Sequence, residues 1–250
     1  MITKSLPSLF TIANLFLGII SIIFVFNERP DLAVVMVVIA MLTDGLDGRV
    51  ARALNVQSDF GKELDSLSDI ISFGVAPAFI MYVVAFQDLN AAAGWIVTAI
   101  FPICGALRLA RFNVMTSTTP GYFIGLPIPA AGGILCMLAL FAEQLPIIVL
   151  LISTLLLSFL MISNIKYPNF KKVGFSKRVI WVTPLIILGA IPLAVQFPGY
   201  WSKLLLIPLL VYALYGLKKN VSVLVLKLLR RKKREQNLEL DESQNFKYKV

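Results

Sequence analysis

Acidic residues gather in one short stretch of a chain that is otherwise apolar. Only 14 of the 250 residues are Asp or Glu, and five aspartates lie within 26 consecutive positions: Asp44, Asp47, Asp59, Asp65 and Asp69. Asp44 and Asp47 are three residues apart and Asp65 and Asp69 are four apart, so each pair shares one face of a helix. Four converging carboxylates repel one another unless cations lie between them, and all-oxygen ligation suits Mg²⁺, Mn²⁺ or Ca²⁺. The spacing predicts a divalent-cation site, of the carboxylate-rich kind that commonly holds two ions.

Glycines and one arginine accompany these aspartates. Gly45, Gly48 and Gly61 remove side chains beside the predicted site, which lets a bulky ligand or a neighbouring helix approach the backbone. Arg52, one turn after Gly48, could pair with a carboxylate or bind a phosphate. The plainer interpretation is that aspartates at helix ends cap those helices or neutralise nearby basic residues. Capping does not explain two same-face pairs with glycines between them, so we favour metal and phosphate chemistry.

The chain contains no histidine. This excludes His-based catalytic triads, zinc sites with His ligands and imidazole as a general base. Acid–base chemistry therefore falls to carboxylates, Lys, Tyr or Cys. The two cysteines, Cys104 and Cys136, lie in apolar runs, where we expect them to pack as small hydrophobic residues rather than to form a disulfide framework.

The elements that must position the aspartates are membrane helices. The chain is 58% hydrophobic and 15% charged, with a mean hydropathy of +0.83, whereas a soluble domain has about 25% charged residues. A helix needs about 20 apolar residues to cross a bilayer. The runs that qualify are residues 8–26, 31–54, 63–86, 91–113, 124–143, 146–164, 179–197 and 201–217. The sequence predicts an all-α, polytopic membrane helix bundle with about eight transmembrane helices and no cleaved signal peptide.

The basic residues predict the orientation of this bundle. If the N-terminus is cytoplasmic, only Arg29 and Lys203 of the 23 Lys and Arg residues lie outside, as the positive-inside rule requires. Both termini and the aspartate cluster are then cytoplasmic. The net charge of +9 reflects this topology and contact with anionic lipid, so nucleic acid is not expected as a partner. We expect a membrane-embedded catalytic domain over residues 1–217 and a basic cytoplasmic tail over 218–250.

The aspartate-rich stretch resembles the signature of the CDP-alcohol phosphatidyltransferase family. The pattern D-x2-D-G-x2-A-R-x8-G-x3-D-x3-D is matched without departure by Asp44, Asp47, Gly48, Ala51, Arg52, Gly61, Asp65 and Asp69. The resemblance implies a six-helix catalytic core, a homodimer and a site at the cytoplasmic face of the membrane. LPSLFTIANLFLG near the N-terminus, SFGVAPA at 72–78 and RLARFN at 108–113 resemble the branch that uses L-serine as acceptor in bacterial inner membranes.

This resemblance also implies a reaction and a role for each matched residue. The phosphatidyl group of CDP-diacylglycerol would pass to the serine hydroxyl, with release of CMP. The metal ligands, for two Mg²⁺ or Mn²⁺ ions, would be Asp44, Asp47, Asp65 and Asp69. Asp69 would also be the general base. The residues that bind CDP-diacylglycerol would be Thr11, Asn14, Asp44, Gly48, Arg52 and Gly61.

Three polar residues follow at the cytoplasmic end of the fourth predicted span. Arg108 and Arg111 share one helical face and could bind the lipid diphosphate or the serine carboxylate, with Asn113 contributing a hydrogen bond. The alternative is that the two arginines only anchor the helix at the cytoplasmic side. These two interpretations stay open.

Two rival functions follow from the same residues. The first is the same transfer to another alcohol, such as glycerol 3-phosphate, inositol phosphate or choline. A phosphorylated acceptor calls for extra cationic residues, whereas the first predicted span offers Thr11 and Asn14. The second is cation transport, which predicts acidic groups deep in several spans and inverted repeats. The clustering of the aspartates at one edge favours the transferase.

Overall fold

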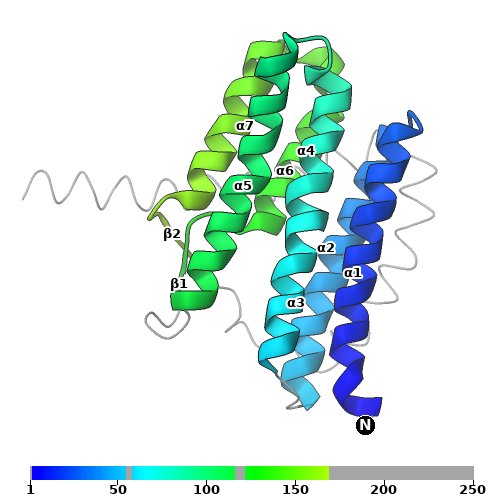
Figure 1. Cartoon of the computed structure of the whole chain (residues 1–250), viewed down its shortest axis with the longest axis vertical. Coiled ribbons are helices and arrows are strands. Elements are labelled where there is room, and N and C mark those ends of the chain that lie inside the picture. Colours follow the sequence, from blue (N-terminus) through cyan, green and yellow to red (C-terminus); the bar gives the residue numbers. More distant parts are fainter. Residues whose placement is uncertain (1, 55–57, 116–121, 169–250) are drawn as a thin grey trace, which may run out of the picture.

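The computed structural model describes residues 2–54, 58–115 and 122–168, and this part of the chain is mostly helical. The long helices run lengthwise along the bundle (Figure 1). In chain order the elements are α1 (Ile2–Phe26), α2 (Pro30–Leu54), α3 (Asp59–Asp69), η1 (Ile70–Val75), α4 (Ala76–Met81), η2 (Tyr82–Phe86), α5 (Ala91–Met115), β1 (Tyr122–Ile124), α6 (Ile128–Ala139), η3 (Ala142–Gln144), α7 (Ile147–Ile162) and β2 (Lys166–Pro168). The four elements from α3 to η2 follow one another directly and form one long rod.

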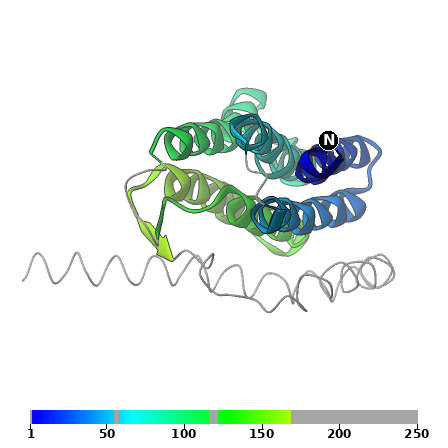
Figure 2. The same cartoon turned by 90° about the horizontal axis from the view of Figure 1, so that it is seen from below.

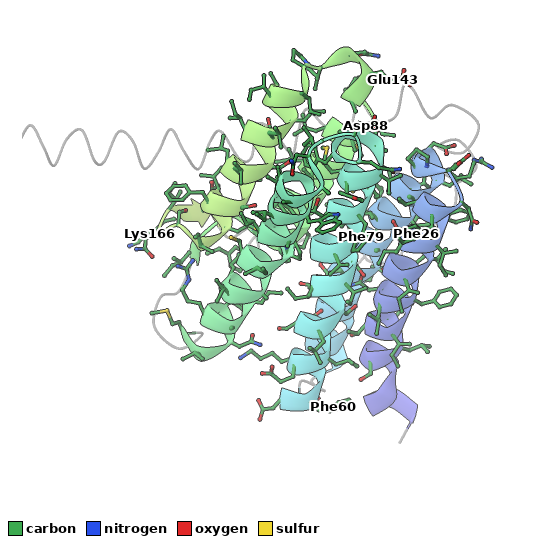
Figure 3. The ribbon with its side chains drawn as sticks, turned by 45° about the horizontal axis from the view of Figure 1, so that its top comes forward. Phe26, Phe60, Phe79, Asp88, Glu143 and Lys166 are labelled. Carbon is green, nitrogen blue, oxygen red and sulfur yellow. The ribbon has the colours of Figure 1, made fainter. Side chains whose placement is uncertain are left out.

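The helices lie in two layers when the bundle is viewed along the rods (Figure 2). One layer holds α1, the rod from α3 to η2, and α5, and the other holds α2, α6 and α7. Across the layers, α1 packs on α2, α4 on α6 and α5 on α7. Phe60, near the start of α3, lies at one end of the bundle, and Asp88 and Glu143 lie at the other (Figure 3).

Three described helical stretches are long and apolar enough to cross a membrane: Ser8–Phe26, Asp59–Phe86 and Ala91–Met115. Two shorter apolar helices, α6 and α7, have 12 and 16 residues. Each of the first six predicted spans falls on a helix. The last two predicted spans, and the division into residues 1–217 and 218–250, fall outside the described residues.

The bundle exposes many large apolar side chains and buries several polar ones within its apolar core, unlike a typical soluble protein. Large apolar side chains are exposed in a regular stripe along α1: Leu9, Ile12, Phe16, Ile19, Ile23 and Phe26. The polar side chains buried against neighbouring helices include Thr11, Asn14, Ser21, Ser68, Ser72, Thr154 and Ser158. Interhelical contacts in lipid favour such small polar residues, because apolar side chains gain little by leaving lipid tails.

The long rod changes its winding directly after Asp69. Residues Ile70–Val75 form a π-helix, and the N–H of Ala76 donates to the carbonyl oxygen of Ile71, five residues earlier. Pro77 has no N–H for the carbonyl of Phe73, which removes one α-helical hydrogen bond at this point. Gly132 of α6 approaches that carbonyl so closely that a Cβ there would collide with it. Single π-turns of this kind occur often at functional sites.

The expectation of an all-helical chain missed a short antiparallel sheet. β1 pairs with β2, with Phe123 opposite Tyr167, and Tyr167 is fully buried. α6 therefore begins at Ile128, after Pro127, and not at residue 124. The segments that enter α6 and leave α7 lie side by side, and pairing them satisfies backbone groups that a helix would otherwise satisfy. Gly125 takes a positive φ of 78° at this turn, and its N–H donates to the carbonyl oxygen of Ile165 at 2.8 Å.

Candidate functional site

Three aspartates from two helices meet inside the bundle. Asp44 of α2 and both Asp65 and Asp69 of α3 each place a carboxylate oxygen so that all three oxygens lie within 4.8 Å of one another. Asp44 and Asp65 are half-buried, and Asp69 is only 7% exposed. The two pairs predicted to converge therefore each contribute to one cluster.

The start of α3 sets the position of Asp65 and Asp69. Ser58 caps this helix, because its Oγ accepts a hydrogen bond from the N–H of Gly61 at 3.0 Å. A Cβ at Gly61 would lie 3.1 Å from the same oxygen, so the small size of Gly61 serves the cap as well as any nearby ligand. The sequence interpretation missed Ser58, although a serine just before a helical run is a common capping signal.

The carboxylate cluster has the chemistry of a metal site. Oxygen ligands lie about 2.0–2.6 Å from Mg²⁺ or Ca²⁺, so oxygens that share one ion lie within about twice that distance. The spacing of the three carboxylates meets this condition. Three carboxylates brought together in a bundle with an apolar exterior also repel one another strongly, and a cation removes that repulsion. The acidic triad could therefore hold a divalent cation.

The signature continues along α2, beyond Asp44. Asp47 is one turn further along the same helix, and Gly48 follows it and is half-buried. The side chains of Asp47 and Arg52 lie outside the part of the chain that the structure describes. Their predicted roles in metal and phosphate binding stay predictions.

Asn14 connects α1 to the aspartate cluster. Asn14 is fully buried, and its Nδ2 donates to Asp69 Oδ1 at 3.4 Å. Its Oδ1 is also buried and has no hydrogen-bond partner among the described residues. A buried oxygen without a donor costs about 1–3 kcal/mol, so a substrate N–H or O–H would be stabilised there. Thr11, one turn earlier, is 4% exposed.

The two arginines of α5 have different surroundings. Arg108 is 5% exposed, so its guanidinium is held inside the bundle. Arg111 instead donates from Nη1 to the carbonyl of Ile162 at 2.8 Å, and from Nη2 to that of Ser163 at 3.0 Å. Longer contacts reach the carbonyls of Ile124 and Met161. Arg111 thus caps the C-terminal end of α7, where helix carbonyls lack intrahelical partners.

Asn113 ties α5 to the helix that carries two of the aspartates. Its Nδ2 donates to Ser66 Oγ at 3.0 Å and to Glu63 Oε2 at 3.2 Å. In return, Lys62 Nζ donates to the Asn113 carbonyl at 3.2 Å. Both side-chain contacts lie within one turn of Asp65. Asn113 therefore helps to fix the position of α3.

Comparison with known proteins agrees with the signature. The model of the CDP-alcohol phosphatidyltransferase family matches residues 4–164. A CDP-diacylglycerol–serine O-phosphatidyltransferase of Helicobacter pylori is 48% identical over 135 residues, which cover 53% of this chain and 56% of the relative. The enzyme of the same name in Bacillus subtilis is 42% identical over 144 residues, 58% of this chain and 79% of the relative.

The chain is also similar to an archaeal protein that has a different name. The archaetidylserine synthase of Methanothermobacter thermautotrophicus is 42% identical over 132 residues, which cover 51% of this chain and 54% of that protein. The matched part of the chain spans about half the length of the Helicobacter and archaeal proteins. The family match covers more than half of this chain, including α1, the aspartate cluster and α7. With its long apolar helices, this protein is an integral membrane member of the CDP-alcohol phosphatidyltransferase family.

Proposed function

We propose that this protein transfers the phosphatidyl group of CDP-diacylglycerol to the hydroxyl of L-serine, forming phosphatidylserine and CMP. The observation that carries the proposal is the convergence of Asp44, Asp65 and Asp69 within a chain that carries the whole family signature. The names of the Helicobacter and Bacillus relatives support serine as the acceptor. The chemistry is phospholipid synthesis at a membrane surface.

All four aspartates of the signature are metal ligands, and Asp69 is also the base. Asp44, Asp47, Asp65 and Asp69 would hold two Mg²⁺ or Mn²⁺ ions, and these would neutralise the diphosphate and make CMP a better leaving group. The serine oxygen attacks the β-phosphorus, the bond from that phosphorus to the CMP oxygen breaks, and Asp69 accepts the hydroxyl proton. Asn14 orients the Asp69 carboxylate through its 3.4 Å hydrogen bond.

The substrates are bound by the residues around this cluster. Thr11, Asn14, Gly48, Arg52 and Gly61 line the CDP pocket, and the buried Oδ1 of Asn14 accepts a hydrogen bond from the substrate. On α5, Arg108 binds an anion, either the lipid diphosphate or the serine carboxylate. Its burial favours this role, because a charge-assisted hydrogen bond strengthens where water is scarce.

The proposed setting is the cytoplasmic membrane of a bacterium. Eight transmembrane helices, of which six form the catalytic core, place both termini and the site in the cytoplasm, as the distribution of Lys and Arg favours. Residues 1–217 form the catalytic domain and residues 218–250 a basic tail on anionic lipid. The protein works as a homodimer.

A direct assay tests the reaction. Protein purified in detergent is given CDP-diacylglycerol, Mn²⁺ or Mg²⁺, and each alcohol in turn, while CMP release and the lipid product are measured. We expect CMP release that requires L-serine and is abolished by EDTA, because the carboxylates need the cation to bind the diphosphate. Release that requires glycerol 3-phosphate, inositol phosphate or choline would overturn the acceptor. No metal-dependent release from folded protein would overturn the reaction.

A separate prediction follows from the contacts of Arg111. Arg111→Ala is expected to lower the free energy of unfolding by roughly 1.5–3 kcal/mol, since hydrogen bonds from a charged donor to carbonyls at the end of α7 are lost. KM for serine and for CDP-diacylglycerol should stay within about twofold. Thermal unfolding in detergent and steady-state kinetics measure the two quantities. A large rise in either KM with unchanged thermal stability would show that Arg111 binds substrate.

A further inference from the structure

One polar stripe runs along the long rod and faces α1. Asp65, Ser68, Asp69 and Ser72 follow the i, i+3, i+4, i+7 spacing of one helical face. Ser68 and Ser72 are fully buried, and Asp69 is 7% exposed. The serines therefore continue the face that carries two of the aspartates. Neither serine takes part directly in the proposed reaction.

Both serines bind the backbone of α1. Ser68 Oγ donates to the carbonyl oxygen of Thr11 at 3.1 Å, and Ser72 Oγ donates to that of Asn14 at 2.8 Å. Each acceptor belongs to a helix in which the carbonyl already has an intrahelical partner, so the serine bonds add a direct link between two helices. The two links lie one turn apart and hold α1 at two successive points.

Asn14 connects these links to Asp69. Its carbonyl accepts from Ser72 while its side-chain Nδ2 donates to Asp69 at 3.4 Å. That second distance is near the upper limit for a hydrogen bond, so a shift of α1 by a few tenths of an ångström would break it. The position of α1 thus decides whether Asn14 reaches the carboxylate.

We propose that Ser68 and Ser72 are positioning residues that hold α1 against the long rod and keep Asn14 in contact with Asp69. This inference rests on the proposed function, in which Asp69 is the base and Asn14 orients it. The serines do not touch the reacting atoms, and their effect on the reaction passes through Asn14. Their loss should therefore lower kcat rather than only destabilise the protein.

The chain offers a matched control two turns further along α1. Ser21 is also fully buried, and its Oγ donates to the carbonyl oxygen of Ala33 in α2 at 2.9 Å. This bond has the same chemistry and the same kind of interhelical acceptor, but it lies two turns from Asn14. Ser21→Ala reports the cost of losing one such bond away from the aspartates.

The test compares three variants with the wild type: Ser68→Ala/Ser72→Ala, Asn14→Ala and Ser21→Ala. We expect the double serine variant to lower kcat for CMP release by about 10- to 100-fold, since small misplacements in an active site have effects of this size. Ser21→Ala should keep kcat within about twofold of the wild-type value. Its fall in melting temperature per lost hydrogen bond should be similar to that of the double serine variant. Mn²⁺ affinity, measured by electron paramagnetic resonance without substrate, should weaken in the double serine variant and stay unchanged in Ser21→Ala.

A double-mutant cycle separates positioning from general destabilisation. In the Asn14→Ala background, the two serine substitutions should lower kcat by less than about twofold more, because the contact that they maintain is already absent. Full additivity there, or a double serine variant whose kcat and Mn²⁺ affinity match Ser21→Ala, would overturn the inference while leaving the proposed function intact. A wild type that is folded but releases no CMP with any alcohol would instead overturn the proposed function and, with it, this inference.

Discussion

Replacing Asp69 by asparagine is expected to lower serine-dependent CMP release by roughly 10²- to 10⁴-fold, the range of a lost general base. The substitution keeps the shape of the side chain but removes its charge and its ability to accept a proton. Asp69 lies within 4.8 Å of the oxygens of Asp44 and Asp65, so Mn²⁺ should also bind more weakly. Initial rates of CMP release at saturating Mn²⁺ separate the loss of the base from the loss of the metal.

Asp59 supplies the control for this experiment. It is exposed in the first turn of the same helix and is not one of the signature residues. Asp59→Asn should change the rate by less than about threefold, because only a weak, solvent-screened interaction with the helix N-terminus is lost. An Asp69→Asn protein that is folded and keeps more than a tenth of the wild-type rate would contradict the role given to Asp69.

Gly18→Ala is expected to disrupt the contact between α1 and the long rod. A Cβ at Gly18 would lie 2.5 Å from Ser72 Oγ and 2.8 Å from Ser72 Cα. The Oγ can rotate away, but the Cα belongs to the backbone, so α1 must move outward. Overpacking of this kind costs about 1–3 kcal/mol. Because Asn14 lies one turn from Gly18, CMP release should fall by at least about tenfold. Thermal unfolding and kcat measure the two effects.

Gly45 shows what the same substitution does where there is room. Among the described residues, no heavy atom lies within 4 Å of a Cβ built at Gly45, which is exposed on α2. Gly45→Ala should keep or raise the melting temperature, since alanine is favoured over glycine in a helix by about 0.5–1 kcal/mol. A Gly18→Ala protein that is as stable and as active as the wild type would show that α1 does not press on η1.

Much of the fold could be predicted because lipid imposes simple rules on sequence. A helix that crosses a bilayer needs a long apolar run, and the first six predicted spans all fall on helices. Convergence of the aspartates also followed from spacing, because residues three or four apart share a helical face. The structure brings Asp44, Asp65 and Asp69 together as the spacing predicted.

Other features depend on contacts between segments that no local pattern contains. The π-helix after Asp69 occurs where Pro77 lacks an N–H and Gly132 of α6 approaches the carbonyl of Phe73. The β1–β2 pairing joins segments more than 40 residues apart. From the sequence, Arg111 could either bind an anion or anchor its helix, and in the structure its partners are carbonyls of α7. Each outcome was decided by which backbone groups lay nearby and lacked a partner.

The sequence by itself determined the chemistry of this protein: a membrane solvent, no histidine, and carboxylates at helical spacing within a complete family signature. These are properties of composition and local periodicity, and they do not depend on how the helices pack. Only the tertiary structure decided which polar groups meet, because hydrogen bonds and close approaches depend on distances between helices. The bond from Asn14 to Asp69 and the two serine links join residues more than 50 positions apart, and packing of α1 on the long rod created them.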